Sequence, residues 1–310
     1  MKPANATLTG VLLMASGAMI APGIDVFAKL VPHEIPVAQV TAARFIMQSS
    51  LLLPIAAFMA VLHLPNRQEV VLHLLRATLI MVATGLFFTA LRSMPIADAI
   101  AVFFVEPFIL TLLGAVILKE TVGPRRIIAC LIGFIGALFV IRPSFANTGA
   151  VALLPLGTAA CFAVYMILTR QMAQKMHPLA MQSYTAIAAV VLSVPVLWIA
   201  DGSNIAGLDP AWPSAFAVQM MIGVGVMATL AHLLIGFAMA KAPASTLAPL
   251  QYLEIVTATI FGIAIFGDVP TPTTLLGVAI IISSGLYILA RERKSSAEAA
   301  LKQTQVNDAK

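Results

Sequence analysis

Residues 101–120 read AVFFVEPFILTLLGAVILKE, and residues 249–268 read PLQYLEIVTATIFGIAIFGD. Both stretches are mostly apolar over about 20 residues, the length an α-helix needs to cross the hydrocarbon layer of a membrane. Each also carries one glutamate, Glu106 or Glu254, at the same position of the stretch. An ionisable group in such a segment must face protein or water, so the pattern indicates membrane-spanning helices with polar groups held inside the bundle.

The rest of the chain has the same character. Of its 310 residues, 60% are hydrophobic and 10% are charged, whereas a soluble domain carries about 25% charged residues. This composition excludes a disordered protein, a secreted disulfide scaffold and a cytosolic nucleic-acid-binding protein. The sequence predicts an all-α integral membrane protein with ten transmembrane helices, over Leu8–Val31, Val37–Leu62, Leu72–Leu91, Ala97–Leu118, Ile127–Ile141, Gly149–Leu168, Leu179–Ala200, Pro213–Ala240, Ser245–Phe266 and Thr273–Ala290.

The basic residues predict the orientation, because cytoplasmic loops carry an excess of Lys and Arg. Most of the 18 Lys and Arg residues fall on the side of the N-terminus, Arg67 and Arg76 among them, so both termini are predicted to be cytoplasmic. Lys29 is expected to extend to the outer interface. The first span is longer than the apolar region of a signal peptide and is interpreted as an uncleaved helix.

An internal repeat relates the two halves. A shift of 148 residues places Glu106 on Glu254, and it also aligns Thr111 with Thr259, Gly114 with Gly262, Glu120 with Asp268 and Pro124 with Pro272. We therefore expect a first five-helix repeat at 1–143, a second at 144–290 and a cytoplasmic disordered tail at 291–310. Five spans are an odd number, so the second repeat is inverted, and inverted repeats place a binding site near the midplane between them. The alternative is that apolar sequence matches itself by chance.

The chain resembles the drug/metabolite transporter superfamily in its EamA-type branch. The resemblance rests on Val105-Glu106-Pro107, Leu118-Lys119-Glu120, the run from Gly133 to Pro143, and Leu253-Glu254, Gly267-Asp268 and Gly277 in the second half. Ile255 and Asp268 depart from the usual Pro and Glu. The resemblance implies a secondary transporter of a small organic metabolite in the bacterial inner membrane, not an enzyme. Residues 22–29 look closer to riboflavin-type uptake proteins than to amino-acid exporters. Amino acids, S-adenosylmethionine and related metabolites stay open as substrates, in either direction of transport.

The candidate site residues are the polar and aromatic groups of the predicted spans. Glu106 shares a helix face with Phe103, and Glu254 shares one with Gln251 and follows Tyr252. Each glutamate either serves the substrate or proton pathway or is a protonated group bonded to a neighbouring helix. Asp25 and Arg44 are expected at similar depth, as a fixed pair or an outer gate. His232 is a core histidine or a proton carrier. Weaker candidates for the cavity are Gln39, Gln48, Tyr165, Gln182, Tyr184 and Gln219.

Several common sites have no counterpart in the sequence. It contains no phosphate-binding G-x-x-x-x-G-K-[ST] loop, no H-E-x-x-H zinc motif and no G-x-S-x-G nucleophile motif. Cys130 and Cys161 lie in apolar runs and are interpreted as core residues, so no metal site is expected. In the absence of the motifs above, we also expect no cofactor and no catalytic residues. The expected partners are a small-molecule substrate and membrane lipid, with a homodimer left open. Two other classes remain as alternatives, a membrane-embedded enzyme acting on a lipid-linked substrate and a structural or receptor-like subunit.

Overall fold

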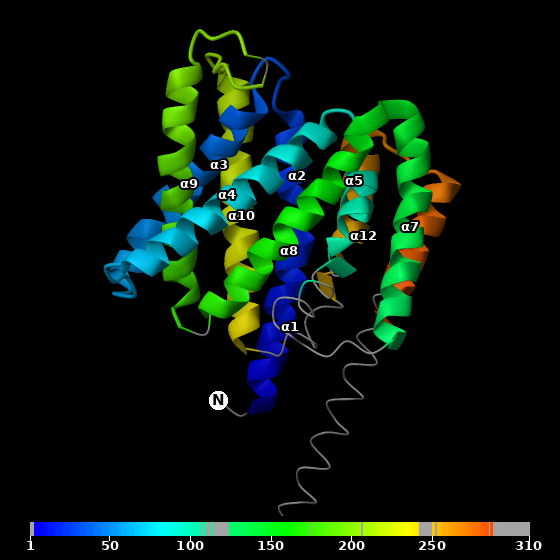
Figure 1. Cartoon of the computed structure of the whole chain (residues 1–310), viewed down its shortest axis with the longest axis horizontal. Helices are drawn as coiled ribbons and strands as arrows, with labels where there is room; N and C mark the ends of the chain where they lie inside the picture. Colours follow the sequence, from blue (N-terminus) through cyan, green and yellow to red (C-terminus); the bar gives the residue numbers. More distant parts are fainter. Residues whose placement is uncertain are drawn as a thin grey trace, which may run out of the picture.

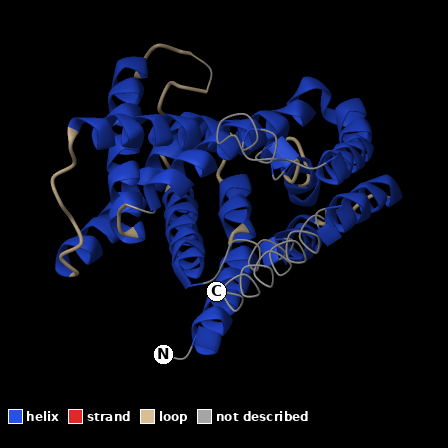
Figure 2. Cartoon of the chain, turned by 60° about the horizontal axis from the view of Figure 1, so that its bottom comes forward, coloured by secondary structure: helices blue, strands red, loops and turns tan. Residues whose placement is uncertain are grey.

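The computed structural model describes residues 3–106, 108–109, 113, 124–173, 175–205, 207–241, 250–251, 253–284 and 286–287. Within these ranges all regular secondary structure is helical and no strand is present, as Figure 2 shows. The expectation of an all-α chain is confirmed for this part of the protein.

The helices follow one another with short connections. The first half contains α1 (Pro3–Ile20), α2 (Pro22–Leu30), α3 (Val37–Phe58), α4 (Arg67–Leu91), α5 (Ile96–Phe103) and α7 (Pro124–Thr148). The second half contains the 3-10 helix η1 (Gly149–Leu153), α8 (Leu154–Ala173), α9 (Pro178–Ala200), α10 (Ala215–Lys241), α12 (Leu253–Phe261), the π-helix η2 (Gly262–Phe266) and a helix at Pro272–Ser284.

Six segments of the described chain are long and apolar enough to cross a membrane. They are Leu8–Leu30, Val37–Phe58, Arg67–Leu91, Phe145–Thr169, Pro178–Ala200 and Ala215–Ala238. They correspond to the predicted first, second, third, sixth, seventh and eighth spans. The fourth, fifth, ninth and tenth predicted spans coincide with helices that do not meet these criteria over the described residues, so the full count of ten stays a prediction.

Two helices differ in detail from the predicted spans. The first span divides into α1 and α2 at Ala21, because Pro22 occupies the first turn of α2 and has no backbone N–H to donate. Ala21 itself keeps a helical conformation, so the two parts form one apolar segment. The fifth span, predicted at Ile127–Ile141, corresponds to α7, which is longer at both ends with 25 residues.

The two halves pack against each other through matching helices. In Figure 1, α1 lies beside α10 and α4 beside α8, and the contacts between residues agree. In addition, α3 contacts both α9 and α10, and α4 contacts α9. Suppose that the first, second and third spans (α1, α3 and α4) correspond to the sixth, seventh and eighth (α8, α9 and α10). The α1–α10 contact then corresponds to the α8–α4 contact, and the α3–α10 contact to the α9–α4 contact. The α3–α9 contact corresponds to itself. The contacts are therefore those that a two-fold relation between the halves produces.

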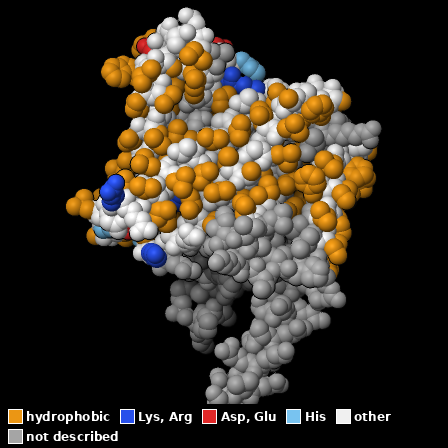
Figure 3. Space-filling model, in the orientation of Figure 1, with side chains coloured by type: hydrophobic (Ala, Val, Ile, Leu, Met, Phe, Trp, Pro, Cys, Tyr) orange, Lys and Arg blue, Asp and Glu red, His pale blue; other side chains and the backbone are white. Residues whose placement is uncertain are grey.

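Apolar side chains cover the outside of the bundle. Figure 3 shows them spread over one face, with a few charged side chains near its margins. Trp198 and Ile199 near the end of α9 are each 80% exposed, and Trp212 before α10 is fully exposed. Both tryptophans lie near one end of the bundle, which is the position of interfacial aromatic residues in membrane proteins. A surface of this composition is suited to lipid rather than water.

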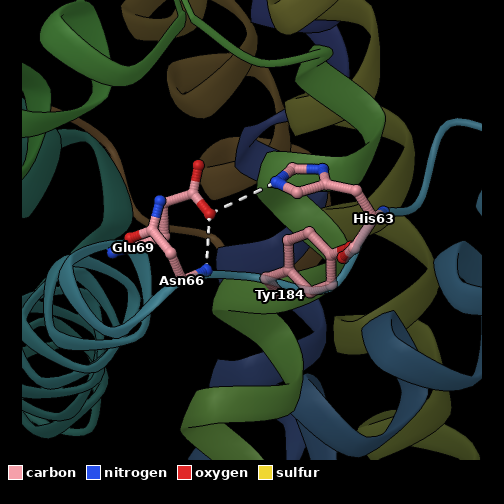
Figure 4. A network of polar contacts seen from close by, with 4 residues as sticks. All are labelled: His63, Asn66, Glu69 and Tyr184. Carbon is pink, nitrogen blue, oxygen red and sulfur yellow. Dashed lines mark hydrogen bonds and ion pairs between the residues drawn. The ribbon is translucent and has the colours of Figure 1, made fainter.

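The connection between α3 and α4 is fixed by a polar network (Figure 4). Asn66 and Glu69 form a capping box, in which the Asn66 side chain accepts from the Glu69 N–H and Glu69 accepts from the Asn66 N–H. Glu69 also contacts His63 Nε2 at 3.3 Å. The Tyr184 hydroxyl of α9 accepts from the His63 N–H at 2.8 Å and donates to the His63 carbonyl. The network ties the start of α4 to α9.

The helix at Pro272–Ser284 packs closely on α7 through two glycines. A Cβ atom at Gly277 would lie 2.6 Å from the carbonyl oxygen of Gly136. We expect G277V to lower the free energy of unfolding by about 1–3 kcal/mol, as overpacking usually does. Thermal unfolding of the protein in detergent measures this, with G85A as the matched control, since a Cβ at Gly85 meets no atom within 4 Å. Equal melting temperatures for the two variants would contradict the close contact.

Candidate functional site

A cavity of about 200 Å³ lies inside the bundle, lined by residues of both halves. A single bound water needs about 10–15 Å³ by this measure, so the space is too large for a packing defect. It brings together the leading site candidates that the structure describes, namely Asp25, Arg44, Phe103, Glu106, His232, Gln251 and Glu254. Tyr252 lies outside the described residues.

An aromatic wall forms one side of the cavity. Tyr165 and Phe162 of α8 have ring centroids 5.5 Å apart, and Phe162 is 5.5 Å from Phe103 of α5. Phe103 then contacts Phe87 and Phe104, each at 6.0 Å. All five rings line the cavity. Such a wall can stack against a planar ring of a ligand.

Three carboxyl groups, those of Asp25, Glu106 and Glu254, line the same cavity. The α5 helix ends at Phe103, just before Glu106, so the predicted fourth span is interrupted where its glutamate lies. Glu106 is 7% exposed, and its Oε1 atom has no hydrogen-bond partner within the described residues. Glu254 lies in the first turn of α12 and lines the same cavity as Glu106 and Asp25. Broken helices with polar groups facing a cavity are typical of transporter binding sites.

Arg44 does not pair with Asp25 as the sequence suggested. Both residues are buried and line the cavity, but no ion pair joins them in the part of the chain that the structure describes. Arg44 Nη1 donates instead to the Thr84 hydroxyl of α4 at 2.6 Å. The Nε atom of Arg44 has no partner among the described residues. The side chain of Arg44 is therefore held by α4 rather than by Asp25.

Arg76 was missed as a site residue. It was counted among the basic residues that mark the side of the N-terminus, but it is fully buried within α4. It contacts Tyr165, Thr169 and Met181, all of which line the cavity. The signal was present in the sequence, since Arg76 falls inside the predicted span Leu72–Leu91.

Lys29 has two polar partners in connections between helices. Its Nζ atom forms an ion pair with Asp268 at 2.8 Å and donates to the Met94 carbonyl at 2.9 Å. Its expected position at the outer interface stays a prediction. The ammonium group lies 4.7 Å from the centre of the Phe266 ring. Asp268 lines a second, smaller cavity, and Lys29 is one helical turn beyond Asp25 of the central cavity. The ion pair thus lies between the two cavities and joins the two halves.

The weaker candidates separate into two groups. Tyr165 and Gln182 line the cavity, whereas Gln39, Gln48, Tyr184 and Gln219 are not among its lining residues. Gln39 holds the backbone of Ala211, donating to its carbonyl at 2.9 Å and accepting from its N–H at 3.0 Å. Tyr184 belongs to the network of Figure 4. These two side chains have structural partners rather than a place at the site.

An apolar helical bundle with a polar, aromatic-walled cavity between its halves is the architecture of a multi-pass membrane transporter. The sequence profile of the EamA-like transporter family matches residues 8–142 and again residues 149–290. The chain belongs to this family, and it is a transporter of the bacterial inner membrane rather than an enzyme. The family resemblance read from the sequence is confirmed, and the membrane-embedded enzyme is set aside.

Characterised relatives share about a quarter of their residues with this chain. A riboflavin transporter of Vibrio cholerae is 28% identical over 267 residues, covering 84% of this chain and 86% of its own length. A riboflavin transporter of Brucella anthropi is 28% identical over 73% of this chain and 78% of its own length. An S-adenosylmethionine uptake transporter of Rickettsia prowazekii is 28% identical over 87% of this chain and 89% of its own length. One solved crystal structure has a similar fold, with a TM-score of 0.63 at 17% identity over 92% of this chain and 96% of that one.

Proposed function

We propose that this chain is a secondary transporter that moves a small organic metabolite across the inner membrane by alternating access, with riboflavin as the substrate. The observation that carries the proposal is the central cavity, which combines an aromatic wall with buried polar groups from both halves. The site residues we assign to the substrate or proton pathway are Asp25, Arg44, Phe103, Glu106, His232, Gln251, Tyr252 and Glu254.

Alternating access requires two halves that can rock against each other. We assign these halves to the repeats at 1–143 and 144–290, the second inverted and both termini cytoplasmic. The double match of the family profile supports two repeats, and the reciprocal packing of α1 on α10 and of α4 on α8 supports a two-fold relation. The cavity lies where these helices meet, so a rocking motion would expose it to one side and then the other.

Riboflavin is favoured by the chemistry of the lining. Its planar ring system can stack on Phe103, Phe162 and Tyr165, while its hydroxyl-bearing side chain can donate to Glu106 and Glu254. The names of relatives from Vibrio cholerae and Brucella anthropi agree with this substrate.

S-adenosylmethionine is the second candidate. Its sulfonium and ammonium groups are cationic, and Asp25, Glu106 and Glu254 supply carboxyl groups on the same cavity. Its adenine ring can stack on the aromatic wall. The name of the relative from Rickettsia prowazekii agrees with this choice.

Uptake into vesicles that contain the purified chain distinguishes the two substrates. We expect saturable uptake of radiolabelled riboflavin, competed by unlabelled riboflavin and not by S-adenosylmethionine. Complementation of a riboflavin-requiring bacterial strain at low vitamin concentration is the matching test in cells. Saturable uptake of S-adenosylmethionine alone would replace the substrate, and no saturable uptake of either compound would contradict the proposed function.

A further inference from the structure

Arg76 is a buried cation without a counter-charge in the described chain. It is 0% exposed, and no carboxylate lies within ion-pair distance among the described residues. All of its contacts are with neutral groups. Nη1 donates to the Thr185 hydroxyl at 2.6 Å, Nη2 to the Tyr165 hydroxyl at 3.0 Å and Nε to the Thr169 hydroxyl at 3.3 Å. Burying a charge in this way is costly, so a role beyond packing is indicated.

The hydrogen bond from Arg76 to Tyr165 connects Arg76 to the cavity, because Tyr165 is one of the lining residues. Because Arg76 donates to the Tyr165 oxygen, the hydroxyl hydrogen is free to be donated onward, and it is donated to Gln182 Oε1 at 3.3 Å. The guanidinium group also lies 4.8 Å from the centre of the Tyr165 ring. Gln182 lines the cavity, and with its oxygen engaged its NH₂ group is the part left for a ligand. In this arrangement Arg76, through Tyr165, favours the orientation of the Gln182 amide in which the NH₂ group serves the cavity.

Arg44 supplies a second donor to the same cavity. Arg44 lines the cavity and is 5% exposed as a residue, and its Nε atom has no partner among the described residues. Glu106, in contrast, presents an unpartnered carboxyl oxygen. The lining therefore contains one set of donors, from Arg44 and Gln182, and one set of acceptors, from the carboxyl groups. A cavity with both sets recognises a ligand that has both kinds of group.

We propose that Arg76 is a positioning residue. Acting through Tyr165 and Gln182, it gives one part of the cavity a hydrogen-bond donor. This donor binds an electron-rich hydrogen-bond acceptor of the substrate, a carboxylate or a ring carbonyl. This rests on the proposed function and narrows it to substrates that carry such an acceptor as well as donor or cationic groups. Riboflavin meets the requirement through its ring carbonyl groups, and S-adenosylmethionine meets it through its carboxylate.

Two parent compounds and their analogues test the proposal by binding to the purified protein in detergent. Riboflavin is compared with 2-thioriboflavin and with 4-thioriboflavin, whose sulfur accepts hydrogen bonds weakly. S-adenosylmethionine is compared with its decarboxylated form, so that each analogue differs from its parent only in the acceptor. For the parent compound that the protein transports, we expect at least tenfold tighter binding than for its analogue, which is about 1.4 kcal/mol. In R76Q we expect this ratio to fall to within about twofold.

Two further variants keep the test independent of folding. Y165F removes the hydroxyl that links Arg76 to Gln182 but keeps the ring, and it should lower the ratio in the same way. R67Q changes an exposed arginine of the same helix and should leave the ratio unchanged. A ratio that survives in both R76Q and Y165F, with uptake intact, overturns this inference alone. If neither parent compound binds the unaltered protein or enters vesicles, the proposed substrates and this inference fall together.

Discussion

We expect E254Q and E106Q each to lower saturable uptake at least tenfold, and the double variant to abolish it. The two side chains come from the two halves of the chain and meet at one cavity. Gln has nearly the same shape as Glu, so the substitution removes the charge and the proton-binding group while it preserves packing. A tenfold loss corresponds to about 1.4 kcal/mol, which is close to the lower end of the roughly 1.5–3 kcal/mol that a hydrogen bond to a charged group contributes.

Vesicle uptake at matched protein levels measures the effect, with E34Q as the control because Glu34 is exposed in the connection between α2 and α3. The same assay with and without an imposed pH gradient separates substrate binding from proton coupling. If the unaltered protein responds to the gradient and E106Q and E254Q do not, these carboxyl groups carry the proton. The other ionisable groups that line this cavity are Asp25, Arg44, Tyr165 and His232. Unchanged uptake in both single variants would remove the glutamates from the transport pathway.

The class of fold could be predicted because the membrane imposes simple rules on sequence. Apolar length and the placement of charge were sufficient to locate the six segments that the structure bears out. The same rules work poorly where a helix is interrupted. The break after Phe103 depends on local backbone geometry near Glu106, and a count of apolar residues does not register it.

The contents of the cavity were easier to predict than the partners of its residues. Any ionisable group deep in an apolar span must face protein or a cavity, and this rule singled out Glu106 and Glu254 near the midplane and Asp25 with Arg44 as a separate pair. The structure places all four along one cavity. Depth along a helix, however, gives no information about rotation around it. Arg44 therefore contacts Thr84 rather than Asp25, and Lys29 contacts a residue 239 positions away in the sequence.

The contact between Lys29 and Asp268 leads to a second prediction of large effect, that this ion pair closes the cavity on the outer side. The pair joins α2 of the first half to the segment after η2 of the second half. Its two side chains are 17% and 26% exposed, and it lies between the central cavity and the smaller one. Gly267 adopts a left-handed conformation with φ of 71° at the end of η2, which places Asp268 at the contact.

We expect K29D and D268K each to lower uptake at least tenfold, because each places two like charges where the ion pair forms. The exchange K29D/D268K restores an attractive pair, so uptake should return to within about threefold of the unaltered protein. This double-variant cycle isolates the interaction from other effects of each substitution. K175D is the matched control, since Lys175 is an exposed lysine in the connection between α8 and α9.

A covalent link tests whether the contact must open during transport. In a variant without Cys130 and Cys161, we introduce K29C/D268C and join the two thiols with a short, reducible cross-linker. If the ion pair marks a gate, the linked protein still folds but stops transport, and reduction restores its activity. A linked protein that transports normally, or an exchanged pair no more active than either single variant, would show that the contact is a fixed part of the fold. A gate between the halves has to separate in every cycle, whereas a structural ion pair stays closed, and this difference makes the cross-link decisive.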